Sequence, residues 1–239
     1  MSVEEPVRRV ALVAERRLVG QAIAAALRGR GLAPVLFEWP ERGGRLSFRQ
    51  GLARSGASVG VILCDLRTPD LLHDVELLVS RGPIRWLVLT DSEFGPRWGT
   101  VLGAGATGVL PTTTTTAGLA KAVRDTLAGG SPTPDVLRER ALREWESVAE
   151  EQRELVRRME LLTHREYEVL GALYDGLSVR RIADASGVAE ATVRSQVKSL
   201  RRKLGVDSQL AAVALYRRDR KSTRLNSSHT DISRMPSSA

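Results

Sequence analysis

A row of positively charged side chains in residues 190–204 is the feature of this sequence that points most directly to a chemical task. At the spacing of an α-helix, apolar residues fall on one face and basic residues lie beside them. The apolar residues are Val193, Val197, Leu200 and Leu204, and the basic residues are Arg194, Lys198, Arg201 and Arg202. A helix held by one face and basic on the other can enter a groove of DNA. For any single basic residue, the alternative is an ordinary solvated helix face.

A second group of polar side chains lies in the first half of the chain. Glu15, Asp65, Thr90 and Thr112 each come just after an apolar run that is predicted to be a strand. Open parallel sheets bind ligands outside the carboxyl ends of their strands, so chemistry is expected at these positions. The alternative is structural, because an acid or hydroxyl at a strand end can also cap a neighbouring turn or helix.

No further catalytic set is evident in the sequence. It has no nucleophile elbow, no glycine-rich phosphate loop and no cysteine spacing typical of a metal site. The only cysteine, Cys64, lies inside an apolar run, which excludes an internal disulfide and predicts a buried thiol. We therefore predict that the protein is not an enzyme.

Composition favours a basic two-domain protein. The 239 residues carry a formal net charge of +8, which suits a polyanionic partner. Most domains hold about 100 to 150 residues, so the length suggests two of them. No apolar stretch approaches the roughly 18 residues that would cross a bilayer, and no secretory signal opens the chain. These features predict a cytoplasmic location without membrane association.

The elements that must position the first site alternate between apolar runs and amphipathic stretches. Strands are predicted near 8–14, 33–38, 58–64, 85–90 and 107–110. Helices are predicted near 18–29, 47–55, 70–80, 95–103 and 116–129. This fivefold βα repeat predicts an α/β doubly wound, flavodoxin-like domain over residues 1–130.

A helical linker is predicted over residues 131–161, because the paired glycines and spaced prolines of residues 129–134 end the first domain. Apolar residues in this segment recur in alternating steps of four and three. They are Ala141, Trp145, Val148, Gln152, Leu155, Met159 and Leu162, with Gln152 as the polar exception. Two alternatives stay open: a short coiled coil that pairs two chains, or a single helix that packs this stripe against its own domains.

The basic helix belongs to an all-α, helix-turn-helix block predicted over residues 162–218. Thr163 and Glu166 have the spacing of a capping box, which satisfies unpaired amides at a helix start. Gly176 ends that helix, Ser178 caps the next, and Gly187 allows the turn before the basic helix. A final apolar helix begins at residue 207 or 208 and either pairs two domains or completes the core of one.

This block resembles the LuxR-type helix-turn-helix that ends NarL/FixJ-type response regulators. The most specific string is Leu-Thr-x-Arg-Glu-x-Glu-Val-Leu at 162–170, and Lys203-Leu-Gly-Val206 extends the match. The resemblance implies that Arg194, Ser195 and Lys198 face base edges of double-stranded DNA. It implies phosphate contacts for Thr192, Arg202 and Lys203, and a homodimer. Ala189 departs from the family, where a hydroxyl residue often caps this helix.

The first domain resembles the receiver domain of the same regulators, which binds Mg²⁺ and accepts phosphate from a sensor kinase. On this resemblance Asp65 is the candidate phosphoacceptor, Thr90 the candidate switch, and Glu15 with Asp65 the candidate metal ligands. The receiver is atypical. Basic residues Arg16 and Arg17 follow Glu15, and Thr112 stands where the family has a phosphate-pairing lysine. Mg²⁺ binding and phosphorylation are therefore expected to be impaired.

Residues 219–239 have neither apolar periodicity nor a relation to the preceding pattern, and they are predicted to be a disordered tail. The segment also resembles a translation of a common sequencing-library adapter, over Lys221–His229 and Ser233–Ala239. We therefore expect an assembly artefact, with the natural sequence known to about Arg218. A natural disordered tail is the alternative.

Together these features predict a dimeric DNA-binding transcription regulator of two-component type whose control is independent of phosphorylation. Two alternatives come from other classes of protein. In one, the receiver-like pocket holds a small-molecule ligand. In the other, the helix over residues 135–162 sequesters a partner protein.

Overall fold

The structure of the protein is a computed structural model that describes residues 8–40, 45–80 and 82–230. It contains two compact units, Met1–Val148 and Ala149–Ala239, which are described separately below. The division between them falls inside the predicted linker. Within the described residues, no helix combines the length and the apolar character that crossing a membrane requires.

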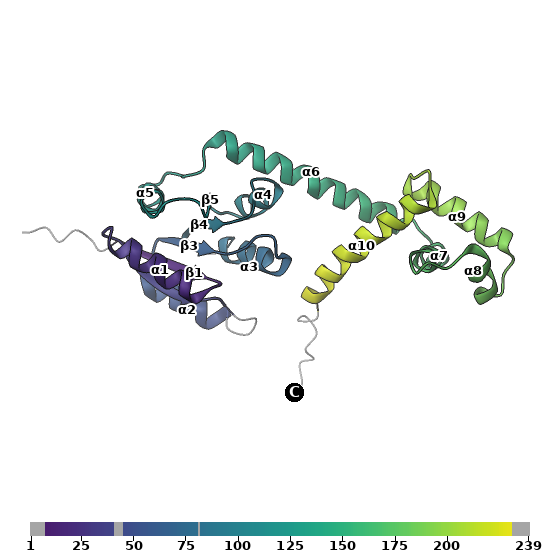
Figure 1. Cartoon of the computed structure of the whole chain (residues 1–239), viewed down its shortest axis with the longest axis horizontal. Helices are drawn as coiled ribbons and strands as arrows, with labels where there is room; N and C mark the ends of the chain where they lie inside the picture. Colours follow the sequence, from purple (N-terminus) through teal and green to yellow (C-terminus); the bar gives the residue numbers. More distant parts are fainter. Residues whose placement is uncertain (1–7, 41–44, 81, 231–239) are drawn as a thin grey trace, which may run out of the picture. The chain divides into compact units, whose positions relative to one another are not determined.

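A parallel sheet of five strands forms the centre of the first unit (Figure 1). The strands are β1 (Arg9–Ala14), β2 (Ala33–Glu38), β3 (Val59–Leu63), β4 (Arg85–Thr90) and β5 (Gly108–Pro111). Their order is β2-β1-β3-β4-β5, and Leu12 of β1 pairs with Leu36 on one side and Val61 on the other. The predicted doubly wound α/β fold is confirmed, with nearly the predicted bounds for each strand.

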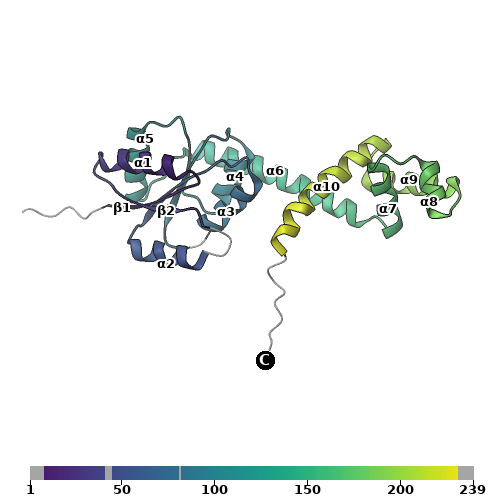
Figure 2. The ribbon, with the colours of Figure 1, turned by 60° about the horizontal axis from the view of Figure 1, so that its bottom comes forward.

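Helices cover both faces of this sheet (Figure 2). They are α1 (Arg17–Arg28), α2 (Arg45–Ser55), α3 (Pro69–Val79), α4 (Pro96–Gly103) and α5 (Thr116–Leu127). Alternate residues of β1 face opposite cores, as the two-residue period of a strand requires. Leu12 packs in the core with α1 and α5, whereas Val13 packs in the core with α3 and α4.

The long helix α6 (Asp135–Glu160) begins within the first unit and lies against α4. Two glycines of α4 permit this close approach. A Cβ atom on Gly99 would lie 2.1 Å from the carbonyl oxygen of Ala141, and one on Gly103 would lie 3.2 Å from the Trp145 ring. The segment before α6 is also fixed, because the buried Thr133 hydroxyl accepts a hydrogen bond from the Val109 amide at 2.9 Å.

Four further helices and the end of α6 make up the second unit. They are α7 (His164–Tyr174), α8 (Val179–Ser186), α9 (Glu190–Leu204) and α10 (Gln209–Thr230). Leu155 and Met159 of α6 are buried in their common core, while Ala141 of the same predicted seam is buried in the first unit. These buried residues agree with a helix that packs against its own domains, but Val148 of the same row is 49% exposed, so the coiled-coil alternative stays open as well.

Helix α10 differs from the prediction at its end. It continues through residues 219–230, which the sequence assigns to a disordered tail. Its first part anchors it, because Asp219 is buried and hydrogen bonded to Tyr167, and the Arg220 guanidinium lies 5.8 Å from the centre of the Tyr174 ring. Extending a helix that already exists costs little per residue, so the polar sequence can follow as helix. Residues 231–239 lie outside the described residues, and the adapter origin stays a prediction.

Candidate functional site

Helix α9 presents a basic face that is held in place by a buried apolar face. Its buried residues are Val193, Val197, Leu200 and Leu204, as predicted. Its exposed residues include Thr192, Arg194, Ser195, Lys198 and Arg202, which are five of the six predicted DNA contacts. Along this face runs an open hollow whose lining includes Arg194, Lys198 and Arg202, with Val179 of α8 beside them. The basic face of α9 is therefore positively charged, and the buried apolar residues hold its backbone in place.

The turns around α9 are the ones that the sequence predicts. The side chain of Ser178 accepts a hydrogen bond from the Arg181 amide at the start of α8. Gly187 has φ of 64° and Gly205 has φ of 67°, left-handed conformations that favour glycine at helix ends. Ala189 makes no side-chain cap, so α9 begins without one. Packing rather than capping must therefore hold its first turn.

The Arg194 side chain is exposed but oriented. Its guanidinium contacts the Glu190 carboxylate one turn earlier at 2.8 Å, and 71% of the Arg194 side chain is open to solvent. Exposed ion pairs contribute only about 0–1 kcal/mol, so a ligand with negative charge can displace this one cheaply. Arg194 is therefore available for an external contact.

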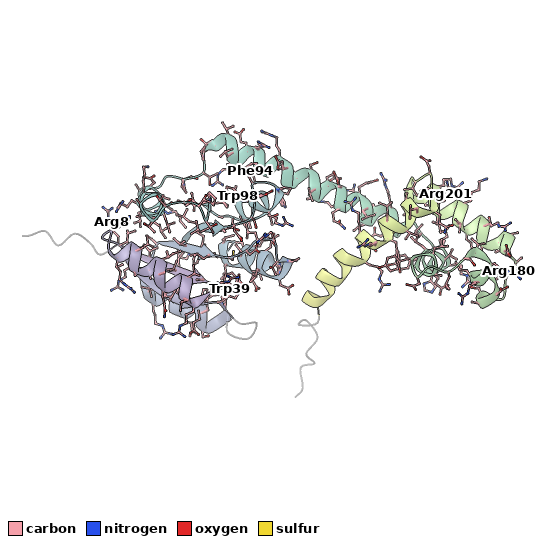
Figure 3. All side chains as sticks on the ribbon, in the orientation of Figure 1. Arg8, Trp39, Phe94, Trp98, Arg180 and Arg201 are labelled. Atoms are coloured by element: carbon pink, nitrogen blue, oxygen red, sulfur yellow. The ribbon has the colours of Figure 1, made fainter. Side chains whose placement is uncertain are left out.

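Arg201 behaves differently from the rest of the basic row (Figure 3). It is partly buried, and its guanidinium donates a hydrogen bond to the carbonyl oxygen of Asp207, in the turn before α10. Arg201 therefore supports the turn between the two helices. Sequence analysis also missed two exposed arginines, Arg180 and Arg181, in the first turn of α8. Their place directly after the Ser178 cap is the signal that could have identified them.

Lys203, the sixth predicted contact, is engaged inside the domain. Its ammonium lies 2.6 Å from the Glu166 carboxylate, and the two side chains are 26% and 8% exposed. The same carboxylate accepts a hydrogen bond from the Thr163 amide at 2.8 Å, which completes the predicted capping box. Burial favours the protonated form of Glu166, but hydrogen bonds from Lys203, Thr163 and Ser199 outweigh it and lower its pKa to about 2. Lys203 thus ties α9 to the start of α7.

This ion pair predicts a specific acid sensitivity of the second unit. The ordinary pKa is 4.5, so above that value Glu166 is ionised in both the folded and the unfolded chain and the stabilisation is fully present. As the pH falls from 4.5 to about 2, the unfolded chain takes up a proton that the folded chain does not, and stability is lost. Glu166→Gln is expected to lower the free energy of unfolding at neutral pH by about 1–3 kcal/mol and to flatten this pH dependence.

Urea unfolding at a series of pH values, followed by near-ultraviolet circular dichroism of the tyrosines, measures the effect. All three tyrosines, Tyr167, Tyr174 and Tyr216, lie in the second unit. The control is Glu190→Gln, which removes a surface carboxylate and should keep the wild-type dependence. An unchanged pH dependence in Glu166→Gln would contradict the assignment.

The second candidate site lies at the carboxyl edge of the sheet. The Cys64 thiol is buried there, as predicted. Burial, followed by the nearby charges of Glu15, Asp65 and Asp91, raises its pKa to about 12. The thiol is therefore inert, and these three carboxylates share its surroundings.

Asp65 is held by an arginine that the sequence analysis did not single out. The Arg67 Nε donates to both Asp65 oxygens, at 2.9 and 3.0 Å, and the Ser92 hydroxyl donates to Oδ1 at 3.3 Å. Hydrogen bonds from Arg67 are the main reason that the pKa of Asp65 falls to about 2. Arg67 also reaches Asp91 at 2.9 Å. The position of Arg67 two residues after Asp65 was the only feature of the sequence that could have indicated this ion pair.

The hydroxyls of the predicted receiver site have structural roles. Thr90 is fully buried, and its hydroxyl oxygen accepts hydrogen bonds from the amides of Ser92 at 3.2 Å and Leu66 at 3.5 Å. The Thr112 amide donates to the Thr90 carbonyl oxygen at 2.9 Å, and its exposed side chain brings no charge to the pocket. For Thr90, these contacts favour the structural alternative.

The residues at this edge do not fit Mg²⁺. Octahedral Mg²⁺ needs carboxylate oxygens that are free to coordinate it, and both oxygens of Asp65 are taken by Arg67. Across the part of the chain that the structure describes, no three side chains of His, Cys, Asp or Glu are grouped to hold a metal ion. The candidate pair Glu15 and Asp65 therefore gains no support as a metal site.

Comparison with known proteins identifies the family. Residues 160–216 match the family described as bacterial regulatory proteins, luxR family. The DNA-binding transcriptional activator DevR/DosR of Mycobacterium tuberculosis is 33% identical over 191 residues, which cover 77% of this chain and 86% of that protein. The chain is a NarL/FixJ-type response regulator. Its family consists of DNA-binding transcription regulators and not of enzymes, as predicted.

A second relative agrees with this assignment. The nitrate/nitrite response regulator protein NarP of Escherichia coli is 33% identical to this response regulator over 168 residues, 68% of this chain and 74% of NarP. Among solved structures, Salmonella typhimurium RcsB is 21% identical with a TM-score of 0.44, covering 88% of this chain and 98% of that chain. The response regulator ChrA is 22% identical with a TM-score of 0.44, covering 90% and 99%.

Proposed function

We propose that this response regulator binds double-stranded DNA by placing α9 in the major groove. The observation that carries the proposal is the exposed basic face of α9, backed by four buried apolar residues. Arg194, Ser195 and Lys198 would face base edges, and Thr192 and Arg202 would contact phosphates. An arginine can form a paired hydrogen bond with guanine, whereas phosphate contacts add affinity without choosing a sequence.

Two adjustments to the predicted contacts follow from the geometry. Lys203 belongs to the support of α9, because its ammonium is committed to the buried Glu166. Arg180 and Arg181 join the phosphate-contacting set. They are exposed in the first turn of α8, and the first helix of a helix-turn-helix crosses the DNA backbone.

The proposed active form is a homodimer that is paired through α10. This helix has two distinct faces, since Ala212 and Tyr216 are buried in the domain core while Leu210 is 79% exposed and Ala214 is also exposed. An exposed leucine beside a small residue allows a second α10 to approach closely. A symmetric pair of this kind would bind two half-sites related by two-fold symmetry.

Control of this regulator is proposed to be independent of phosphorylation, in a cytoplasmic protein. The support is chemical: Asp65 is already ion-paired with Arg67, and Thr112 supplies no positive charge for a phosphoryl group. If a sensor kinase does act on this chain, Asp65 is the acceptor. Neither alternative class of function gains a specific observation, since Asp65 is paired with Arg67, and Leu155 and Met159 of α6 are buried in their own domain.

Salt dependence of binding to a random-sequence duplex tests the proposed surface, with full-length protein and fluorescence anisotropy. The double variant Arg180→Ala/Arg202→Ala removes two proposed phosphate contacts, so it should weaken binding and reduce the slope of log affinity against log salt by about 2, close to one unit for each lost contact. The matched control Arg28→Ala/Arg49→Ala removes the same charge from exposed positions of the first unit and should keep the wild-type slope. Equal losses in both variants would mean that binding follows net charge and not α9.

A further inference from the structure

The Arg67 guanidinium lies between Asp65 and Asp91 at the carboxyl edge of the sheet, and 59% of its side chain is exposed. We call this group of side chains the carboxyl-edge pocket. The guanidinium makes two hydrogen bonds from Nε to Asp65, and its Nη2 lies 2.9 Å from an oxygen of Asp65 and 2.9 Å from an oxygen of Asp91. The planar, permanently charged fork of arginine suits this bridging of two carboxylates. One side chain of the protein thus provides the positive charge between the two acids.

The surroundings of this bridge leave little role for a second cation. Arg67 is stabilised in its charged form first by Asp65, then by Asp91, and further by Glu93. A metal ion bound at Asp65 would lie within a few ångströms of the guanidinium, and the two positive charges would repel. Each of these exposed ion pairs contributes only about 0–1 kcal/mol, but a metal ion would have to break both of them and also overcome this repulsion.

We propose that Arg67 is the resident cation of this pocket, that it takes the place of a divalent metal, and that it holds the pocket in one fixed arrangement. The pocket is thereby complete without Mg²⁺. The role of this pocket is to hold the loop after β4 in place. The cation that holds the loop is the Arg67 side chain, which is part of the protein itself.

The arrangement extends from Asp65 to the linker helix. The Ser92 hydroxyl donates to Asp65, and the Ser92 carbonyl oxygen accepts a hydrogen bond from the Trp98 indole at 3.0 Å. Trp98 packs edge-on against Phe94, with ring centres 5.6 Å apart; both residues are labelled in Figure 3. The Arg140 guanidinium of α6 lies 4.9 Å from the centre of the Phe94 ring. Fixing Ser92 therefore also fixes the face of α4 on which α6 packs.

Binding of Mn²⁺ to the full-length protein tests the proposal, with free Mn²⁺ counted by electron paramagnetic resonance. Wild-type protein is expected to bind no Mn²⁺ that depends on Asp65. Arg67→Gln removes the charge and should bind Mn²⁺ at least about tenfold more tightly. Adding Asp65→Asn to that variant should abolish the gain in Mn²⁺ affinity. The control Arg28→Gln replaces an exposed arginine of α1 and should bind Mn²⁺ as the wild type does.

Fluorine resonances of 5-fluorotryptophan report whether the loop responds. The fluorine resonance of Trp98 should be unaffected by Mg²⁺ in the wild type. In Arg67→Gln, the same resonance should shift or broaden when Mg²⁺ is added. Trp86, buried against Gly60, shows whether the variant is folded. Asp65-dependent Mn²⁺ binding by the wild type would overturn the proposal, as would a folded Arg67→Gln that binds no more tightly than wild type. Neither readout involves DNA, so the outcome is separate from that of the duplex-binding test.

Discussion

Replacing Leu200 with alanine is expected to lower the free energy of unfolding of the second unit by about 2–5 kcal/mol. Leu200 is fully buried at the centre of the core that joins α6, α7, α8, α9 and α10. The loss combines the transfer energy of the removed methyl and methylene groups with the cost of the cavity they leave. A loss of this size is comparable to the whole stability of a small domain.

The distribution of aromatic residues makes the measurement specific to the second unit. All four tryptophans, Trp39, Trp86, Trp98 and Trp145, lie in the first unit, whereas all three tyrosines lie in the second. In urea unfolding, Leu200→Ala should shift the transition followed by tyrosine circular dichroism. The transition followed by tryptophan fluorescence should move much less.

A matched substitution on the surface provides the control for Leu200→Ala. Leu161 is 61% exposed in the turn between α6 and α7, so Leu161→Ala should change stability by less than about 0.5 kcal/mol. Equal effects of the two substitutions would contradict the assignment of Leu200 to the core and, with it, the orientation of α9.

Arg194→Ala is expected to lose sequence discrimination more than affinity. If Arg194 forms a paired hydrogen bond with guanine, its removal should reduce discrimination between the preferred duplex and one with that base pair exchanged by about 1–3 kcal/mol. Competition experiments with the two duplexes, at one fixed salt concentration, measure this difference. The Glu190 ion pair that Arg194 gives up is exposed and offsets little of the effect.

Arg202→Ala is the matched comparison, since it removes the same kind of side chain from the same helix. A phosphate contact carries no sequence information, so this variant should bind both duplexes more weakly by the same factor. The base-contact assignment would be contradicted if Arg194→Ala weakened both duplexes equally.

Apolar runs and helical periodicity in the sequence were sufficient to predict most of the fold. The central strands of the first unit are short apolar runs that are buried on both faces, as in β3, and the amphipathic stretches between strands predict the helices. In the second unit burial follows the helical period, as for Val193 and Val197 of α9. Local cap chemistry was equally informative. The capping box of Thr163 and Glu166 and the Ser178 cap need only a few neighbouring residues, so spacing alone identifies them.

Contacts between distant residues were not predictable in the same way. The Lys203 ammonium reaches a carboxylate 37 positions earlier, and the Arg67 guanidinium reaches Asp91, which lies 24 positions later. Helical spacing says which side of a helix a lysine occupies, but it does not say what packs there. The sequence therefore did not reveal the ion pair between Lys203 and Glu166, and it missed Arg67 altogether.

The end of α10 shows a related effect of context. Residues after Arg218 lack apolar periodicity, which favours disorder, yet Asp219 is buried beside Tyr167 and the helix continues to Thr230. A preceding helix and a tertiary contact supply the ordering that the local sequence does not.

The basic face of α9 is proposed to recognise DNA sequence. Selecting duplexes from a random-sequence pool with the full-length protein tests this proposal. We expect enrichment of a site with two half-sites related by two-fold symmetry. We also expect that Arg194→Ala, selected in parallel, loses the preference at one base pair in each half-site. Wild-type protein that enriches no sequence, or an Arg194→Ala variant that enriches the same site unchanged, would contradict the proposal.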